Sequence, residues 1–480
     1  MKKKFYLTTT LPYVNAEPHI GHALEFVQAD AISRYFRNKI GKENVFFNVG
    51  TDEHGQKIFN KAAEEGLTPQ EFVDKYANRF KDYCKLFLVD YDNFYRTSSK
   101  EHHEAAKKFW KACKEKGDIY KKKYKGLYCI GCERFLTEKD LVDGKCPDHG
   151  TVPEEKEEEN YFFKLSNYRD EMFNWLDKNP EFIKPKYKIE ELRKIIMEIE
   201  DISISRLKEN LPWGIEVEDD PEQVFYVWFD ALTNYVNVIG YGTDGEKLKQ
   251  WWPGVQICGP DNLRFQGAIW QGMLSSVGLE HSAKLLVHGM VLAEDGTKMS
   301  KTKGNVISPF DQEKKYGAEI VRYYLLTGIP TFGDAAYKED ELVNSYNSRL
   351  ANNYGNLLNR VIHIANAKDF EINNLENVND EFKKKVEVKG KEIDSFYEDF
   401  EISLAAEKID ELADFGNKYI TKEEPWNKEV SKEKAEEVIN NLSYLLKVVS
   451  EKYIPIIPTS AQKGLQALED REKVILFPRI

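Results

Sequence analysis

The sequence predicts an α/β protein with a parallel sheet, an inserted metal-binding module and a helical C-terminal region. Three observations support this. Strand-like and helix-like segments alternate from residue 4 to residue 63, cysteines and a histidine cluster between residues 129 and 149, and helical periodicity dominates from residue 345 onward. Alternating strands and helices are typical of a parallel sheet. A chain of 480 residues is too long for one hydrophobic core, so we expect several domains.

The first half of the α/β pattern lies at the N-terminus. Residues 4–11 (KFYLTTTL) form a short run of aromatic and β-branched residues that indicates a strand, and residues 21–38 have apolar side chains at helical spacing. Residues 44–49 indicate a second strand, followed by the polar segment GTDEHG and another helix. Ligands of parallel sheets bind at the carboxyl ends of strands, where both polar loops fall. α/β character returns at residues 224–229 and 255–258.

Bulk properties exclude some classes of protein. Hydrophobic residues make up 41% of the chain and no run of about 18 apolar residues occurs, so we expect no transmembrane helix and no membrane partner. The N-terminus is too polar for a signal peptide, which predicts a cytoplasmic protein. The net charge of −12 taken alone argues against an RNA partner, but a local basic track on an acidic protein can still steer RNA. No DNA partner is expected.

A cluster of soft ligands marks the inserted module. Cys129 and Cys132 are followed, after a 13-residue gap, by Cys146 and His149. In a cytoplasmic protein, C-x2-C followed by C-x2-H indicates a metal site rather than disulfides. Four such ligands suit a closed, tetrahedral, structural Zn2+ site. A purely zinc-dependent structural or nucleic-acid module would leave the α/β half of the chain unexplained.

Two motifs indicate phosphate chemistry. The segment PHIGH (18–22) lies between the first strand and the first helix, where backbone N–H groups and the helix dipole favour a phosphate. On its own it is equally compatible with two surface histidines. The segment GTKMSKTKGN (296–305) has three lysines and on its own reads as a solvated basic turn. Together, HIGH near the N-terminus and KMSK far downstream resemble the paired signature of class I aminoacyl-tRNA synthetases.

Within that class the chain resembles the methionyl-tRNA synthetase family along nearly its whole length. The resemblance rests on five further stretches: LPYVNAEPHIGH (11–22), GTDEHGQKI (50–58), DISISR (201–206), YVWFDALTNY (226–235) and LANNYGNLLNR (350–360). It implies a Rossmann-like parallel-sheet catalytic domain, an inserted connective module with a zinc knuckle, and a C-terminal α-helical bundle that binds the anticodon. We therefore expect catalytic halves at residues 1–116 and 226–344, the second with the KMSK loop, around an insertion at 117–225, and a helical domain at 345–480.

The resemblance assigns roles residue by residue. Asp52 matches the carboxylate that pairs with the substrate ammonium group. The methionine side-chain pocket matches Leu11, Tyr13, Trp228, Ala231, Tyr235 and Gln266. The family residues that bind the phosphates of ATP correspond to His19, His22, Lys298 and Lys301, and those near the ATP ribose correspond to Glu25 and Asp261. The family's zinc ligands correspond to Cys129, Cys132, Cys146 and His149. Without the motif context, the pocket residues would read as ordinary core packing.

The implied reaction has two steps. Methionine attacks the α-phosphorus of ATP, which is accompanied by Mg2+, to give methionyl-adenylate and pyrophosphate. The 3′ end of a methionine tRNA with a CAU anticodon then accepts the methionine. Asn356 and Arg360 lie four residues apart, on one helix face, and Trp426 matches a family tryptophan on which an anticodon base stacks.

The chain departs from the family pattern at two positions of note. Gln266 stands where a histidine usually lies beside the methionine sulfur, and Thr302 replaces the usual serine at the end of the KMSK motif. Two alternatives stay open on the sequence: a synthetase for another apolar amino acid, and a catalytically inactive paralogue that only binds tRNA. The retained HIGH and KMSK motifs argue against the second.

Overall fold

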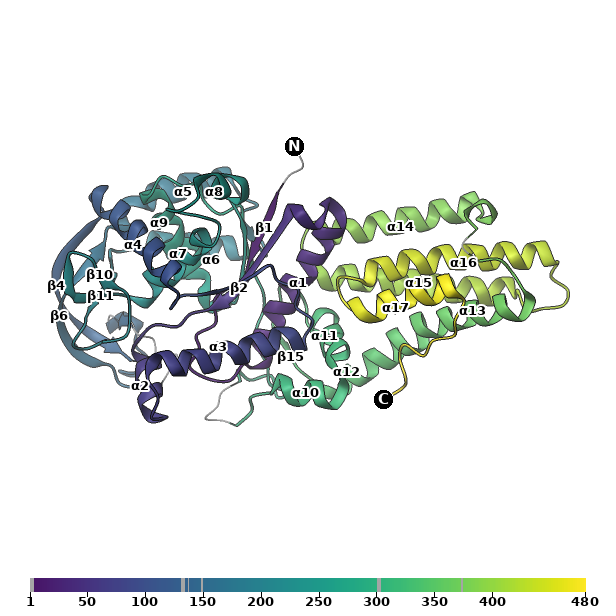
Figure 1. Cartoon of the computed structure of the whole chain (residues 1–480), viewed down its shortest axis with the longest axis horizontal. Helices are drawn as coiled ribbons and strands as arrows, with labels where there is room; N and C mark the ends of the chain where they lie inside the picture. The colour runs from purple at the N-terminus through teal and green to yellow at the C-terminus, as the bar shows by residue number, and fades with distance from the viewer. Residues whose placement is uncertain (1–3, 131–133, 137, 148–149, 300–303, 373) are drawn as a thin grey trace. The chain divides into compact units, whose positions relative to one another are not determined.

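The structure is a computed structural model that describes residues 4–130, 134–136, 138–147, 150–299, 304–372 and 374–480 (Figure 1). The chain forms two compact units that interleave along the sequence. The first contains residues 1–18, 44–82 and 91–287, and the second contains residues 19–43, 83–90 and 288–480. The four consecutive domains expected from the sequence stay a prediction.

The first unit is built on a parallel sheet with the strand order β3-β2-β1-β12-β13-β7. Its strands are β1 (Phe5–Thr8), β2 (Val45–Thr51), β3 (Asn93–Arg96), β7 (Ile183–Lys184), β12 (Val255–Cys258) and β13 (Lys284–Val287). The central strands β1, β2 and β12 are buried along almost their whole length, as a parallel sheet covered on both faces requires. The expected α/β class with a parallel catalytic sheet is therefore confirmed.

Helices around this sheet carry much of the core of the first unit. They include α2 (Gln56–Glu64), α4 (Lys100–Glu115), α5 (Arg169–Lys178), α6 (Lys188–Met197), α7 (Val227–Asn237), α8 (Gly245–Trp251), the π-helical segment η5 (Phe265–Ile269) and α9 (Trp270–Ser276). Phe109, Phe229 and Trp270 pack ring against ring within the largest described apolar cluster of this unit. This cluster holds α4, α7 and η5 together, and two of these elements carry predicted site residues.

Between residues 119 and 225 the chain also forms two antiparallel sheets, within the segment expected to be an insertion. Strands β5 (Arg134–Leu136), β4 (Ile119–Cys129), β6 (Glu154–Phe163) and β8 (Ile202–Ser203) lie side by side in that order, beside a smaller sheet of β10 (Glu216–Val217), β11 (Asp220–Phe225) and β9 (Ser205–Leu207). The lysines of β4 face the glutamates of β6: Lys123 lies opposite Glu159, and Lys125 opposite Glu157. Opposite charges across strands stabilise a hairpin modestly, so the basic and acidic runs are two sides of one ladder.

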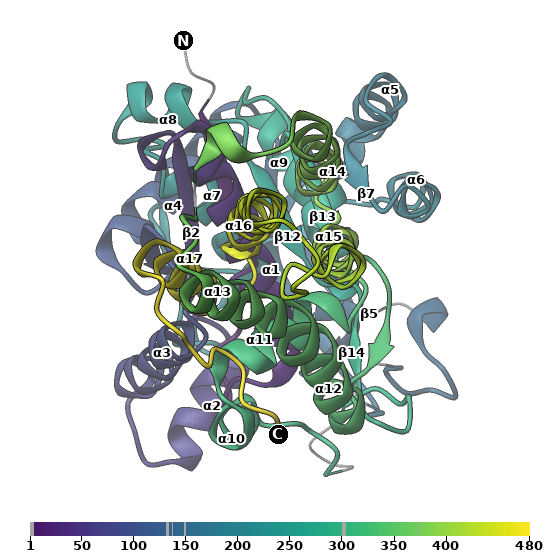
Figure 2. The same cartoon turned by 90° about the vertical axis from the view of Figure 1, so that its right-hand side faces the viewer.

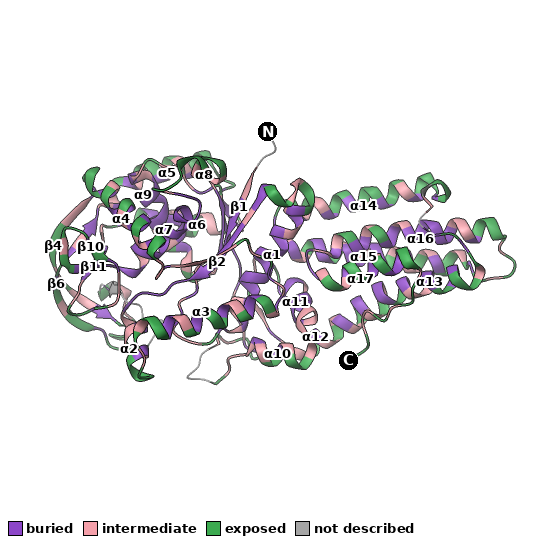
Figure 3. Ribbon diagram, in the orientation of Figure 1, coloured by how far each residue is buried: buried purple, intermediate pink, exposed green. Residues whose placement is uncertain are grey.

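The second unit is mostly helical. It contains α1 (Ile20–Ile40), α10 (Pro309–Tyr316), α11 (Ala318–Thr327) and α12 (Glu339–Ser345), together with the short parallel pair β14 (Val291–Leu292) and β15 (Ala335–Ala336). Helices α13 (Asn356–Lys368), α14 (Asp380–Glu398), α15 (Ile402–Glu423), α16 (Lys432–Tyr453) and α17 (Pro458–Asp470) lie side by side (Figures 1 and 2). Their buried residues form stripes between the helices, while their outer faces are exposed (Figure 3). The expected C-terminal helical bundle is confirmed.

A π-helical segment, η7 (Tyr346–Gly355), joins α12 to α13. The side chain of Asn353 in η7 donates to the backbone carbonyl of Asp410 in α15, at 3.0 Å, and Asn417 donates back to the Asn353 side chain at 2.8 Å. These bonds fix the start of α13, which carries Asn356 and Arg360. Within the described part of the chain, no helix is long and apolar enough to cross a membrane.

A buried carboxylate lies among the helices of the second unit. Tyr453 and Tyr323 both donate hydrogen bonds to the carboxylate of Asp410, the latter at 3.1 Å. Burial raises the pKa of Asp410 to about 6, against the opposing effect of these hydrogen bonds. Because the folded-state pKa lies above that of the unfolded chain, this group stabilises the fold most below pH 4 and least above pH 6.

We expect Asp410→Asn to raise the free energy of unfolding at pH 7.5 by about 1–3 kcal/mol, because asparagine replaces a buried charge with a neutral group of the same shape. The gain should shrink as the pH falls from 6 to 4, where the wild-type carboxyl becomes neutral. Urea unfolding of the wild type and the variant at pH 7.5 and at pH 4 measures the gain in the free energy of unfolding. Asp414→Asn on the exposed face of the same helix is the control and should show no such pH dependence. A gain that does not depend on pH would contradict the ionisation argument.

Candidate active site

The two histidines of the HIGH segment begin helix α1. His19 is the N-cap residue, and its Nδ1 accepts a hydrogen bond from the backbone N–H of Gly21 at 3.2 Å. The Nδ1 of His22 accepts from the backbone N–H of His19, also at 3.2 Å, and the two rings stack with centroids 3.8 Å apart. Since both Nδ1 atoms accept, the proton of each neutral ring lies on Nε2. The helix start therefore presents two ring N–H donors where its own dipole favours an anion.

Gly21 makes this ring position possible. A Cβ atom at Gly21 would lie 3.0 Å from Cε1 and 3.1 Å from Nδ1 of the His19 ring. The backbone N–H of Ile20 donates to the carbonyl of Ile307, just beyond the KMSK segment, at 3.3 Å. The start of α1 is thus held by its own histidines and by the chain that leaves the second motif.

Glu25 lies one turn further along α1, and its side chain is buried. Its Oε2 accepts a hydrogen bond from Nε2 of His288 at 3.1 Å, and Nδ1 of His288 donates to the carbonyl of Gly289 at 2.7 Å. His288 precedes β14, which leads to the KMSK segment. His288 belongs to none of the sequence motifs; its position directly after the buried strand β13 was the available signal. The contact ties the predicted ribose carboxylate to the stem of the second motif.

The described part of the KMSK segment forms the base of a hairpin. Lys298 is exposed and pairs with Leu292 in an isolated antiparallel bridge. Asn305 donates its side-chain amide to the Thr297 hydroxyl at 3.2 Å and to the Lys298 carbonyl at 3.4 Å, across the base of the loop. Lys301 lies outside the described residues, so its role stays a prediction.

The ammonium-binding candidate Asp52 lies at the end of β2. Its backbone N–H donates to the carbonyl of Pro12 at 2.9 Å, and its own carbonyl accepts from Val14 at 3.2 Å, so Tyr13 and Asp52 form a parallel bridge. This bridge places two predicted pocket residues side by side. Leu11 lies on the same loop, and its Cδ2 would be 2.9 Å from a Cβ at Gly50.

The remaining pocket candidates lie on α7 and η5, which pack against each other. Nε2 of Gln266 donates to the Tyr235 hydroxyl at 2.9 Å, and both side chains are buried. Trp228 stacks on Phe265, the neighbour of Gln266, with ring centroids 3.7 Å apart. Ala231 is buried on α7 between Trp228 and Tyr235 in sequence. Oε1 of Gln266 has no hydrogen-bond partner among the described residues, so this pocket offers one unused acceptor.

Asp261 is exposed in a short 3-10 turn directly after β12. That is the carboxyl end of a central strand, the place where ligands of parallel sheets bind. Its predicted contact with the ATP ribose stays a prediction.

A buried cluster next to Asp52 was missed by sequence reasoning. Asp230 of α7 accepts hydrogen bonds from His54, at 2.5 Å, and from His102 of α4. All three side chains are almost completely inaccessible. Burial would raise the pKa of Asp230, but the two histidines outweigh it and hold the pKa below its usual range. His54 and Asp230 lie inside motif stretches, whereas nothing in the sequence singles out His102.

Two of the four predicted zinc ligands lie together in the inserted module. Cys129, Leu136 and Cys146 form a small buried cluster with Leu141 packed against it. The backbone N–H of Gly150 donates to the carbonyl of Cys146 at 2.7 Å. Cys132 and His149 lie outside the described residues, and no metal-binding group of three ligands occurs within the described part.

The anticodon candidates are brought together in the helical bundle. The Arg360 guanidinium lies over the Trp426 ring, 5.5 Å from its centroid, and 43% of Trp426 is exposed. Trp426 lies in the turn between α15 and α16, and Asn356 is exposed one turn before Arg360 on α13. An exposed aromatic face beside a cation suits an unpaired base.

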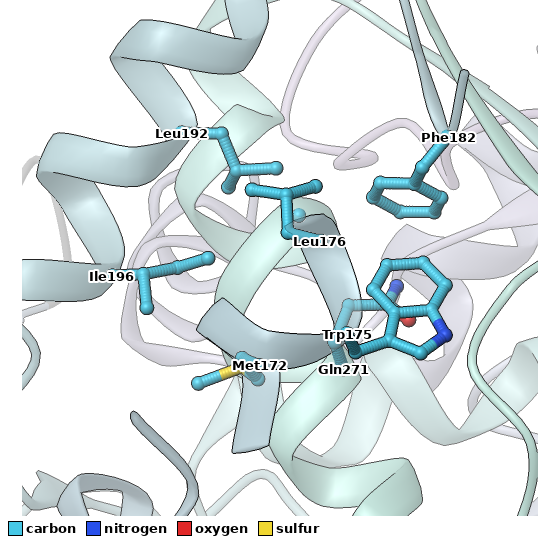
Figure 4. Close-up of a pocket in the computed structure, with 8 residues that line it drawn as sticks. Met172, Trp175, Leu176, Phe182, Leu192, Ile196 and Gln271 are labelled. Carbon is cyan, nitrogen blue, oxygen red and sulfur yellow. The ribbon is translucent and has the colours of Figure 1, made fainter. Parts of the chain in front are cut away.

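A small pocket elsewhere in the first unit has a different character. It lies between α5, α6 and the η5 region and is lined by Met172, Trp175, Leu176, Phe182, Leu192, Ile196, Gly267 and Gln271 (Figure 4). No charged side chain lines it, so it offers nothing to an ammonium group or a phosphate. We interpret it as imperfect packing behind η5.

These features define a nucleotide-dependent enzyme of the class I synthetase type: a parallel sheet, a helix that begins with two histidines, and a lysine-bearing hairpin downstream. Comparison with known proteins agrees. The model of the family "tRNA synthetases class I (M)" matches residues 5–152 and 149–362, and the model of the "Anticodon binding domain of methionyl tRNA ligase" matches residues 371–477. The chain belongs to the methionyl family of class I tRNA synthetases.

Individual relatives support this assignment. The methionine–tRNA ligase of Caldanaerobacter subterraneus subsp. tengcongensis is 38% identical over 98% of this chain and 74% of the relative. That of Thermotoga maritima is 38% identical over 98% of this chain and 76% of the relative. The solved structure of Mycobacterium tuberculosis methionyl-tRNA synthetase in complex with methionyl-adenylate matches with a TM-score of 0.90 and 33% identity, covering 96% of this chain and 93% of that chain.

We expect Gly21→Ala to lower the rate constant of amino-acid activation at least tenfold, because the added Cβ displaces the His19 ring. The thermal midpoint should hardly change, since alanine is favourable in a helix. Steady-state activation kinetics and a thermal melt measure the two effects. Gly245→Ala is the matched control, because a Cβ there meets nothing within 4 Å. A normal rate in Gly21→Ala would show that the ring position does not matter.

Proposed function

We propose that this protein is a methionine–tRNA ligase, which activates methionine with ATP and transfers it to the 3′ end of methionine tRNA. The observation that carries the proposal is the succession of family matches, catalytic over residues 5–362 and anticodon-binding over residues 371–477. An inactive tRNA-binding paralogue is not favoured, because the two HIGH histidines and the described part of the KMSK hairpin keep the groups that activation needs.

Activation asks for positioning and charge stabilisation more than for covalent chemistry. Asp52 would pair with the ammonium group, so an analogue without this group would leave a buried charge uncompensated. Tyr13, Trp228, Ala231 and Tyr235 would surround the thioether, which is polarizable and suits aromatic walls. The open acceptor of Gln266 supports its place at the polar end of this pocket.

The nucleotide side of the site would use the second motif. His19 and His22 would donate their Nε2–H groups to the phosphates as negative charge rises on them, and Lys298 and Lys301 would neutralise the departing pyrophosphate. Mg2+ would accompany ATP through the phosphate oxygens. Glu25 and Asp261 would bind the ribose; for Glu25 this role competes with its bond to His288.

Zinc would be structural. Cys129 and Cys146 are buried together in a cluster with few apolar neighbours, which suits two thiolates of a closed site. Cys132 and His149 would complete the four ligands. Since such a small core supplies little folding free energy, metal binding would supply much of it.

The RNA partner would be a methionine tRNA with a CAU anticodon, bound at Asn356, Arg360 and Trp426, in the cytoplasm. The exposed Trp426 ring, with the Arg360 guanidinium over one face, supports stacking of an unpaired base, and the Asn356 amide can donate to and accept from a base edge.

The function is tested by ATP–pyrophosphate exchange with each of the twenty amino acids, followed by charging of methionine tRNA. Exchange that depends on methionine, together with charging, is the expected result. Exchange that depends on another apolar amino acid would point to a synthetase of different specificity. tRNA binding without exchange for any amino acid would point to an inactive paralogue.

For zinc, we expect purified protein to contain close to one equivalent of the metal by elemental analysis. Cys146→Ser should lower the metal content and the thermal midpoint together. Cys113→Ser, which alters a buried cysteine outside the module, is the control and should keep the metal. Zinc-free wild-type protein of full stability would contradict the proposed site.

For the anticodon, Trp426→Ala should lower aminoacylation at least tenfold while pyrophosphate exchange stays within twofold of wild type, because stacking on an aromatic side chain contributes about 1–3 kcal/mol. Tyr444→Ala, at a partly exposed tyrosine of α16, is the matched control. Equal loss in both assays would indicate a role in folding instead.

A further inference from the structure

We propose that the buried bridge His54–Asp230–His102 is a positioning device that sets the distance between Asp52 and the α7 wall of the amino-acid pocket. Asp230 would act through its neighbours and would not touch the substrate. The inference rests on the proposed function, because it assumes that Asp52 binds the ammonium group and that Trp228, Ala231 and Tyr235 form the wall.

The segment that carries Asp52 is held on two sides. Its backbone is fixed on one side by the bridge to Tyr13. On the other side, Glu53 is fully buried and binds Arg96 of β3 through two hydrogen bonds of 2.7 and 2.9 Å. The indole of Trp213 donates to the Glu53 carbonyl at 2.6 Å. These bonds hold the segment to the sheet edge and to residue 213, and none of them reaches α7.

His54 connects the Asp52 segment to α7. Nδ1 of His54, two residues after Asp52, donates to Oδ2 of Asp230 at 2.5 Å. Asp230 lies in the first turn of α7, two residues after Trp228 and directly before Ala231. The His54–Asp230 hydrogen bond thus directly connects the segment that would bind the ammonium group to the helix that would enclose the methionine side chain.

The second histidine of the bridge, His102, contacts α7 through Asp230 and Asn237. Its Nε2 donates to Oδ1 of Asp230, and its Nδ1 lies 3.5 Å from the side-chain amide of Asn237, which can donate to it. Asn237 lies at the end of α7 and also binds Thr233 at 2.9 Å. His102 therefore anchors α7 to α4 at two places. Because His54 binds Oδ2 and His102 binds Oδ1, both carboxylate oxygens of Asp230 are occupied.

The neighbouring ring of His103 fixes which nitrogen of His54 carries the proton. Burial, with a smaller contribution from His54, lowers the pKa of His103 to about 4, so this ring is uncharged at neutral pH. Its Nε2 lies 3.3 Å from Nε2 of His54 and can donate to it, which leaves the Nδ1 proton of His54 for Asp230. Each donor in the chain thus has one acceptor. The ring nitrogens of His54 and His102 and both carboxylate oxygens of Asp230 are therefore all hydrogen-bonded, whereas the Asn237 Oδ1 has no partner among the described residues. Buried hydrogen-bond networks of this kind are rigid, which a positioning role requires.

The test is pyrophosphate exchange with methionine and ATP varied separately. We expect Asp230→Asn to raise the Michaelis constant for methionine at least tenfold while that for ATP stays within twofold. Asp118→Asn is the matched control. It alters another buried carboxylate of the same unit, bonded by Tyr168 and Ser276, and none of these three residues lies in the proposed pocket. We expect it to reduce stability without this selective effect. Equal changes in the two variants would overturn the inference.

A rescue pair approaches the bridge from the opposite side and covers the case in which Asp230→Asn does not fold. His102→Gln keeps an N–H donor at the reach of Nε2 and should stay within about threefold of the wild-type Michaelis constant for methionine. His102→Leu removes the donor and should raise this constant at least fivefold more than His102→Gln does. The same constant for both variants would overturn the inference.

A double-mutant cycle with Asp52 separates positioning from direct binding. If Asp230 acts through Asp52, Asp52→Asn combined with Asp230→Asn should be little worse for methionine than Asp52→Asn alone. Additive losses would overturn the inference. Wild-type protein without methionine-dependent exchange would instead contradict the proposed function, and a normal Asp52→Asn variant would contradict the assignment of the ammonium site and, with it, the inference.

Discussion

The second unit depends on one buried ion pair. The Arg322 guanidinium is completely inaccessible and binds the equally buried carboxylate of Asp30 on α1. It also donates to the carbonyls of Ile456, Phe87 and Pro455, at 2.7, 3.1 and 2.8 Å. A buried charge is costly unless every donor is matched, and here one side chain matches carbonyls from two separate loops. The helix that begins with His19 and the end of α16 are therefore fixed by the same cation.

Much of the fold was predictable because its signals are local. Helical spacing of apolar residues predicted a helix at residues 21–38, and α1 spans Ile20–Ile40. The aromatic run at residues 224–229 shows where such signals fail. The strand β11 ends at Phe225 and α7 begins at Val227, so a single run contains the change from strand to helix. A continuous apolar run has no periodicity that distinguishes the two, and only its packing decides.

The candidate site divides in the same way. The family resemblance assigned roles to His19, Asp52 and Gln266, and these roles stay predictions. The resemblance could not identify the partners of Asp230, because His54 and His102 lie 176 and 128 residues away along the chain. Likewise the lysines of β4 and the glutamates of β6 lie in two separate charge runs along the sequence. Their pairing depends on strand register, which no local pattern contains.

The π-helical segment η7 has a consequence for the orientation of the α13 face that carries the predicted anticodon residues. An α-helix turns by 100° per residue, and a π-helix accommodates extra residues within each turn. The α-helical repeat, continued from α12 through η7, therefore does not give the direction in which Asn356 and Arg360 face on α13. The gain or loss of a single residue within Tyr346–Gly355 would rotate that face relative to α12 without altering any side chain on it. The length of the π-helical segment η7 is thus a means of reorienting the proposed anticodon-binding face of α13 that does not depend on the side chains of that face.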